Sequence, residues 1–216
     1  MVAYRSLTTS SATIVAKRAT GLEKEKLLLS SSGDADDIIP NSWSRDGQQL
    51  LSTDQGPSHT YLVTSPATGG AKVPLLNSKA NEADGQISPD GRWVAYASDE
   101  SGAWEIYVSS FPGAMGKWQV SRGGGSEPRW RADGKEVFYV SSNGMLMAVP
   151  VNSESTFATG QPAPLFQIHG RAPISSTDIF TYDVAKDGKR FLVNRYVKPD
   201  HVPPLIILLH AAGNPQ

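Results

Sequence analysis

The most regular pattern in this chain is an apolar residue, a polar turn built on Asp-Gly, and a run of apolar residues. It is clearest at 87–96, where Ile87 precedes Ser-Pro-Asp-Gly and an apolar run follows over 93–96. Pro89 sets the φ that the first central position of a tight turn requires, and Gly91 takes a positive φ without a Cβ penalty. The pattern predicts two short antiparallel strands joined by this turn.

The same pattern occurs four times along the chain. Its aspartates, which are 44, 43 and 54 residues apart, are Asp46, Asp90, Asp133 and Asp187. A period in the low forties with strand-type alternation is typical of a four-stranded propeller blade. We therefore predict an all-β fold, a β-propeller or propeller fragment of four-stranded antiparallel blades.

The repeat divides the chain into units, which we expect to form one domain over 1–216. Three units are complete, at 38–80, 81–123 and 124–167. The units at 1–30 and 178–210 are incomplete, with expected strands at Val2–Arg5, Thr13–Lys17, Lys26–Ser30, Ile179–Val184, Arg190–Tyr196 and Leu205–His210. Incomplete blades leave unpaired backbone, so we expect either that the termini close the ring or that two chains pair as a homo-oligomer.

Composition and charge exclude several classes of partner. The formal net charge of -1 gives no electrostatic argument for nucleic acid. The absence of cysteine excludes disulfides and thiolate metal sites. The longest apolar run, at 203–209, is too short to span a bilayer, and residues 1–6 lack the basic-then-apolar order of a signal peptide. We expect no nucleic-acid partner, no membrane insertion and an untargeted chain.

Candidate catalytic and metal-binding residues are few. No serine or histidine sits in a Gly-x-Ser-x-Gly elbow, and the sequence contains no Ser-x-x-Lys frame. His169 lies in the longest irregular stretch and is the best candidate base, although a surface histidine without a catalytic role explains it better. Asp34, Asp36 and Asp37 lack the distal bidentate Glu of a calcium loop, which favours a solvated connector. We predict no catalytic residue, no metal site and no cofactor.

The repeat also explains the tryptophans and the turn aspartates. Trp43 and Trp130 occupy the same repeat position as Ile87, so we predict that both belong to the core of their blades. Trp118 is less constrained by the repeat and could be exposed. The Asp-Gly aspartates recur because each blade must turn there, so we interpret them as structural.

The residues just before each turn differ between repeats, and function is sought there. Innermost propeller strands line a central channel, one end of which is the usual ligand site in such folds. Alignment on the turns gives two polar positions on these strands, one with Asp84 and Glu127 and the other with Ser42, Gln86, Arg129 and Asp183. We predict that this mostly acidic set lines a ligand site; the alternative is that these are merely hydrated channel side chains.

Two stretches of the third unit resemble a known repeat. Residues 88–96, Ser-Pro-Asp-Gly-Arg-Trp-Val-Ala-Tyr, and 105–108, Glu-Ile-Tyr-Val, look like the WD40-like repeat of TolB-type β-propellers. Residues 126–130, 134–139 and 187–194 resemble the propeller appended to some bacterial serine/threonine protein kinases. The sequence contains no kinase phosphate loop, His-Arg-Asp or Asp-Phe-Gly element.

The resemblance implies a fold more directly than an activity. It suggests a non-catalytic binding, sensing or protein-interaction module from a larger bacterial signalling protein, in its extracytoplasmic part. The partner, whether protein or small molecule, stays open. The alternative is a hydrolase of esterase or lactonase type with a site at the mouth of the channel.

Overall fold

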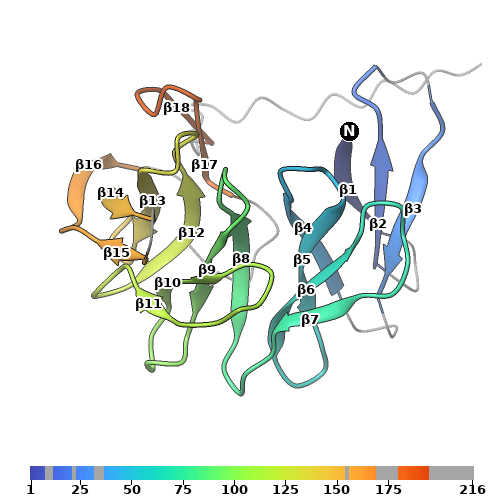
Figure 1. The fold of residues 1–216 in the computed structure, drawn as a ribbon, viewed down its shortest axis with the longest axis horizontal. Helices are drawn as coiled ribbons and strands as arrows, with labels where there is room; N and C mark the ends of the chain where they lie inside the picture. Colours follow the sequence, from blue (N-terminus) through green and yellow to red (C-terminus); the bar gives the residue numbers. More distant parts are fainter. Residues whose placement is uncertain (8–11, 21–22, 32–36, 154–155, 169–179, 195–216) are drawn as a thin grey trace, which may run out of the picture.

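The computed structural model describes residues 1–7, 12–20, 23–31, 37–153, 156–168 and 180–194. Every regular element in these ranges is a β-strand, and the strands form antiparallel sheets that follow one another in an arc (Figure 1). This confirms the predicted all-β propeller fragment. The described ranges contain no helix that is long and apolar enough to cross a membrane.

The sheets follow the sequence repeat. The first sheet has three strands, β1 (Val2–Leu7), β2 (Ala12–Lys17) and β3 (Lys26–Ser30). The second has four strands, β4 (Asp37–Trp43), β5 (Gln49–Gln55), β6 (Thr60–Pro66) and β7 (Val73–Leu76). The third also has four, β8 (Glu82–Ile87), β9 (Trp93–Ser98), β10 (Glu105–Ser110) and β11 (Trp118–Gln119).

The last two sheets complete the arc. In the fourth sheet β12 (Gly125–Trp130), β13 (Glu136–Ser141) and β14 (Met145–Asn152) lie in order, and β14 pairs with both β15 (Ala158–Thr159) and β16 (Ala163–Gln167). The fifth is the hairpin of β17 (Tyr182–Val184) and β18 (Phe191–Val193). The strand expected at 205–210 lies outside the described residues.

The outer strand β11 is shorter than the five residues expected at 117–121. It spans only Trp118 and Gln119. Beyond it, the side-chain Oγ of Ser121 accepts the hydrogen bond from the Ile106 backbone N–H at 2.7 Å. The Ser121 hydroxyl thus takes the place of a backbone acceptor at the end of the strand, while Val120 N–H still donates to Ile106 O at 2.7 Å.

The Asp-Gly turns have the structural role that the sequence predicts. In the turn between β8 and β9, Gly91 N–H donates to Ser88 O at 2.9 Å and Gly91 has φ 75°. Asp90 Oδ1 accepts hydrogen bonds from Ser88 Oγ and Arg92 N–H, at 2.5 and 3.1 Å. The carboxylate is used within the turn, as expected for an Asx-type turn.

The innermost strands β4, β8 and β12 each carry a bulge at the same repeat position. The register shifts between Pro40 and Ser42, and again one and two repeats later. At the later two bulges Asp84 and Glu127 have positive φ, 59° and 55°, which is uncommon for residues other than glycine. A bulge changes the direction in which a side chain leaves the strand, and here it changes the direction of the Asp84 and Glu127 side chains.

Aromatic side chains fill the space between the third and fourth sheets. The Trp93 ring centroid lies 5.4 Å from that of Trp118 and 5.2 Å from that of Phe157. Trp130 is buried in the same cluster, as predicted. Trp43, at the equivalent position of β4, is only half-buried, which differs from the prediction because no inner strand of the first sheet covers it among the described residues.

Candidate functional site

Asp84 and Glu127 lie buried on the neighbouring inner strands β8 and β12, with 3% and 2% of their surfaces exposed. Asp84 Oδ2 accepts a hydrogen bond from Glu127 backbone N–H at 3.3 Å. Glu127 Oε2 in turn accepts hydrogen bonds from Thr181 N–H and Oγ–H, at 2.6 and 2.7 Å. Each carboxylate therefore connects its sheet to the equivalent residue of the next sheet.

Burial raises the pKa of both carboxyl groups. For Asp84 the shift is large, because desolvation acts together with the neighbouring Glu127 carboxylate. For Glu127 desolvation is again the main cause, and the hydrogen bonds from Thr181 offset part of it. The Arg129 guanidinium lowers both pKa values, but less than burial raises them. Burial therefore disfavours the charged form of each acid relative to the same group in water.

Ser42 and Gln86, at the second predicted position, also make contacts between sheets. Ser42 Oγ accepts a hydrogen bond from Ile87 N–H at 3.2 Å, and Gln86 Nε2 donates to Asn41 O at 3.1 Å. The Trp130 indole N–H donates to Gln86 O at 2.9 Å. Much of the hydrogen-bonding capacity of these residues is therefore used inside the propeller.

Arg129 and Asp183 lie in more open surroundings. The Arg129 guanidinium carbon lies 3.7 Å from the centroid of the Phe180 ring. Its Nε lies 3.6 Å from Asp183 Oδ1, and the two side chains are 19% and 69% exposed. An ion pair this long with an exposed carboxylate contributes little, whereas stacking on an aromatic ring holds the planar cation in place. Within the described residues Arg129 Nε makes no hydrogen bond.

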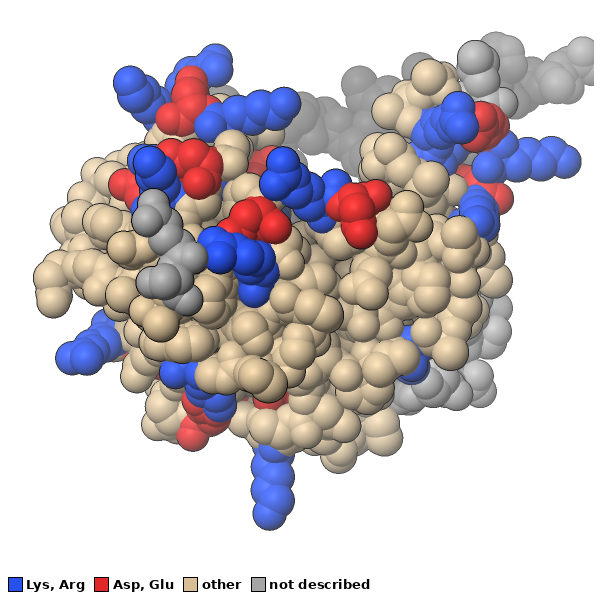
Figure 2. Space-filling view, in the orientation of Figure 1, with Lys and Arg blue, Asp and Glu red and all other residues tan. Residues whose placement is uncertain are grey.

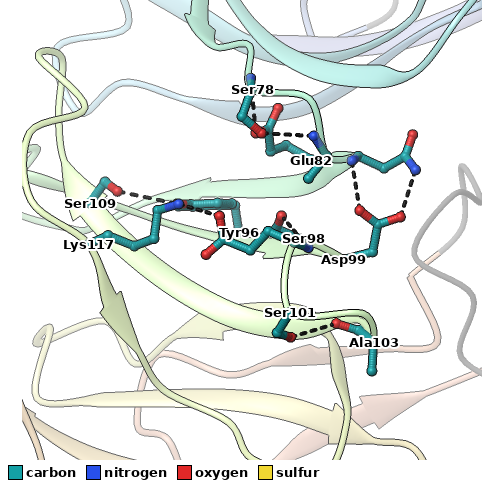
Figure 3. Close-up of polar contacts among 12 residues, drawn as sticks. Ser78, Glu82, Tyr96, Ser98, Asp99, Ser101, Ala103, Ser109 and Lys117 are labelled. Carbon is teal, nitrogen blue, oxygen red and sulfur yellow. Dashed lines mark hydrogen bonds and ion pairs between the residues drawn. The ribbon is translucent and has the colours of Figure 1, made fainter.

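A third buried acid, Glu82, begins β8 and is not singled out by the sequence. It is 2% exposed, and Glu82 Oε1 accepts a hydrogen bond from Ser78 N–H at 3.2 Å (Figure 3). Burial raises its pKa. Close by, Asp99 accepts hydrogen bonds from the backbone and side chain of Asn81, at 2.8 and 2.7 Å. These contacts hold the connection between the second and third sheets.

The described residues contain a single histidine, His59, with polar neighbours on both ring nitrogens. Ser58 Oγ lies 2.9 Å from Nδ1, and Asn77 Oδ1 lies 2.9 Å from Nε2. Sequence reasoning missed this hydroxyl–imidazole–amide chain because Asn77 is distant along the chain.

Several other candidates from the sequence cannot be placed. His169, Asp34 and Asp36 lie outside the described residues. Asp37 forms an ion pair with Arg5.

A cavity of about 540 Å³ lies beside the Asp-Gly turns of the second and third sheets, lined by Ser44, Asp46, Asp90 and Phe111 among others. Asp46 and Asp90 already accept hydrogen bonds within their own turns. On the face shown in Figure 2, basic and acidic side chains are intermixed and form no patch of one sign. The lining of the cavity also contains Arg45, so charges of both signs meet there.

The partners of Glu127 on the fifth sheet were missed by sequence reasoning, although a signal for one of them existed. Thr181 stands at the repeat position of Asp84 and Glu127, so the same alignment on the turns contains it. Tyr182 OH donates to Glu127 O at 2.9 Å. The sequence does not reveal this second contact, because it depends on how β17 packs against β12.

Comparison with known proteins identifies the fold. TolB from Acinetobacter baumannii matches with a TM-score of 0.67 and 18% identity over 88% of this chain and 44% of TolB. A puromycin-hydrolyzing peptidase of Mycobacterium tuberculosis matches with a TM-score of 0.60 and 17% identity over 89% of this chain and 35% of the peptidase. The Cps50 (Swd1) β-propeller domain of Myceliophteria thermophila matches with a TM-score of 0.57 and 16% identity over 88% of this chain and 63% of that domain. No family model matches the chain.

These likenesses confirm the predicted TolB-type, WD40-like propeller fold. The chain spans less than two thirds of the length of each of these three proteins. Since one of them is a peptidase, the fold alone does not decide between an enzyme and a binding module. The resemblance to kinase-appended propellers stays a prediction.

Proposed function

We propose that this chain is a non-catalytic binding module whose ligand presents a carboxylate to Arg129. The single observation that supports this is the set of contacts that the Arg129 guanidinium makes. It is held against the Phe180 ring, while its ion-pair partner Asp183 is largely exposed. The planar fork of arginine suits the two oxygens of a carboxylate, and an exposed side chain such as Asp183 is easily displaced.

The surroundings of Arg129 favour an anionic ligand over a cationic one. Glu127 lies on the same inner strand as Arg129 and Asp84 lies on the neighbouring one, and burial raises the pKa of each acid. A raised pKa means that burial disfavours the negative charge that would repel an incoming carboxylate. Their carboxyl groups also connect the sheets, so the support of Arg129 is built into the fold.

The test compares free and blocked carboxylates. A library of acetylated hexapeptides with free C-terminal carboxylates is titrated against the full chain by calorimetry, next to the same peptides as amides. We expect acids to bind and amides to bind at least about tenfold more weakly, since a charge-assisted hydrogen bond contributes about 1.5–3 kcal/mol. Arg129→Gln should abolish the difference, and Gln in place of the exposed Arg122 should not. Equal binding of acids and amides would refute the proposal.

A hydrolase is the second candidate, because Ser58, His59 and Asn77 form a hydrogen-bonded chain. In serine hydrolases the base takes the proton of the nucleophile and a third group orients it. Here Ser58 is exposed and precedes its histidine directly in sequence. A panel of ester and lactone substrates separates the candidates: turnover that disappears in both Ser58→Ala and His59→Ala would favour the enzyme.

A further inference from the structure

A cavity of about 370 Å³ lies where β12 begins, at the end of that strand opposite its Asp-Gly turn. This volume falls in the range of small-molecule sites. The lining comes from the third and fourth sheets and from the loop between them, and it includes Trp104, Gly123, Gly124, Ser126, Val140 and Ser142. All residues of the lining belong to the range 37–153, so the cavity is built entirely from described parts of the chain.

The lining has no charged side chain, and its backbone donors are already used. Glu105, which is 5% exposed, accepts hydrogen bonds from Gly123 N–H at 2.8 Å and Gly124 N–H at 3.0 Å. Gly125 N–H donates to Trp104 O at 2.8 Å. Successive backbone N–H groups form a typical anion site, and here the carboxylate of the protein itself occupies it. The cavity therefore suits a neutral ligand.

Trp104 lines the cavity at a position where the repeat does not require an aromatic residue. By strand pairing, it corresponds to Thr60 in the second sheet and to Gly144 in the fourth. The ring centroids of the nearby Trp93 and Trp118 lie 5.4 Å apart. Trp104 is half-buried, and within the described residues its indole contacts no other aromatic ring and makes no hydrogen bond. Part of its ring is therefore free to contact a ligand.

Ser126 carries a hydroxyl group that the fold does not use. It is 5% exposed, and within the described part of the chain its Oγ has no hydrogen-bond partner. The same repeat position holds apolar residues in other sheets, namely Ile39, Ala83 and Phe180. A buried hydroxyl without a partner costs free energy, so this one is best explained by a partner from outside the chain. Ser142, the other hydroxyl of the lining, already donates to a backbone carbonyl at 2.7 Å.

We propose that this cavity binds a neutral aromatic ring that carries one hydroxyl group, which is a phenol. The ring lies against Trp104 and Val140, and its hydroxyl forms a hydrogen bond with Ser126 Oγ. Aromatic rings attract each other in offset or edge-to-face arrangements, and a phenol of pKa ~10 is uncharged at neutral pH. Ser126 and Arg129 lie about 10 Å apart along β12 by the rise of a strand, so this site does not depend on the proposal for Arg129.

The test uses ligand pairs that differ in one hydroxyl, titrated into the full ¹⁵N-labelled chain and followed by NMR. We expect p-cresol to bind at least about tenfold more tightly than toluene and to shift the amide signals of residues 123–126. Phenyl phosphate should not bind, because the backbone donors are taken. N-acetyl-tyrosinamide and N-acetyl-phenylalaninamide form a second pair. Tighter binding of p-cresol than of N-acetyl-tyrosinamide would identify a free phenol as the ligand, and the reverse would identify a tyrosine side chain.

Variants of the chain locate the hydrogen bond. Ser126→Ala, which introduces the residue type found at 83, should remove the preference for p-cresol over toluene. Ser65→Ala is the matched control, since Ser65 is 3% exposed, has no hydrogen-bond partner and does not line the cavity. It should keep the preference. Trp104→Thr, which introduces the residue type found at 60, should weaken binding of both ligands by about three- to tenfold.

Three results would overturn the proposal. Equal binding of p-cresol and toluene to the parent chain would do so without any variant, so the test does not depend on whether a variant folds. A preference that persists in Ser126→Ala would also do so. The third is loss of p-cresol binding in Arg129→Gln, because the phenol would then occupy the Arg129 site. Unchanged p-cresol binding in that variant supports a separate site, whatever the outcome for carboxylates.

Discussion

At the scale of single residues, Asp84 and Glu127 combine an unusual backbone with an essential side-chain contact. Positive φ at a residue other than glycine costs energy and persists only where the surroundings impose it. Here the inner-strand bulge imposes it, and the side chain that is turned accepts a backbone N–H of the next sheet. The acids are therefore part of the assembly of the propeller, whatever else they bind.

The energetic cost of burying Asp84 should appear in how the stability of Asp84→Asn, compared with the parent, depends on pH. Burial and Glu127 raise the pKa of Asp84. The folded chain therefore keeps a proton that the unfolded chain releases near pH ~4, and stability is lost as pH rises through the folded-state pKa. Asparagine keeps an oxygen for Glu127 N–H and does not titrate. In urea unfolding, the variant should gain stability relative to the parent as the pH rises above about 4.

Asp46→Asn is the matched control with the opposite sign. The hydrogen bonds from Ser44 Oγ and Gln48 N–H lower the pKa of Asp46. A lowered pKa gives stability that is present above the unfolded-state value and is lost as pH falls through the folded-state one. The parent should therefore lose its advantage over Asp46→Asn in acid. If the two variants respond to pH in the same direction, the assignment of buried and turn acids is wrong.

Gly47→Ala tests the backbone of the turn by itself. Gly47 has φ 68°, and an added Cβ would meet no atom within 4 Å. The cost is therefore conformational, about 1 kcal/mol of unfolding free energy. Asparagine at the same position should cost less, because it tolerates this region better. Unchanged stability in Gly47→Ala would show that the turn can adopt another conformation.

At the scale of elements, the hairpin β17–β18 depends on a contact from outside its own sheet. Glu127→Ala removes the acceptor of Thr181 N–H and Oγ–H. We expect faster amide exchange throughout β17 and β18, with little change in β8 and β9. Glu105→Ala is the control, since that buried acid accepts hydrogen bonds from Ser121, Gly123 and Gly124. Its effect should stay near those residues.

The sequence predicts the elements better than it predicts the contacts between them. The Asp-Gly turns identify the strands on either side, because turn chemistry and apolar alternation are local properties. The double role of Ser42, which lies in β4 and accepts from Ile87 N–H, depends on the spacing of two sheets. The half-buried state of Trp43 has the same origin, since local pattern marks it as core and a neighbouring element decides its burial.

At the scale of the whole molecule, each sheet contacts mainly its neighbours in the arc. Stability in such an array is close to a sum of terms for the sheets and for the interfaces between them. The first and fifth sheets each contact one described neighbour, and their strands are less buried than β8 and β9. The expectation that two chains pair through these end sheets stays a prediction.

Two equivalent isoleucines separate local opening from global unfolding. Ile14 and Ile106 occupy matching positions, and both are 0% exposed. Cutting either to alanine removes the same buried atoms, a change that costs about 2–5 kcal/mol in well-packed cores. By native-state amide exchange, Ile106→Ala should lower the opening free energy of β8–β14 together, because the interior sheets share their cores. Ile14→Ala should lower it only in β1–β3, because the end sheet can open while the interior stays folded. Equal effects of both variants on β8–β14 would mean that the arc unfolds as one cooperative unit.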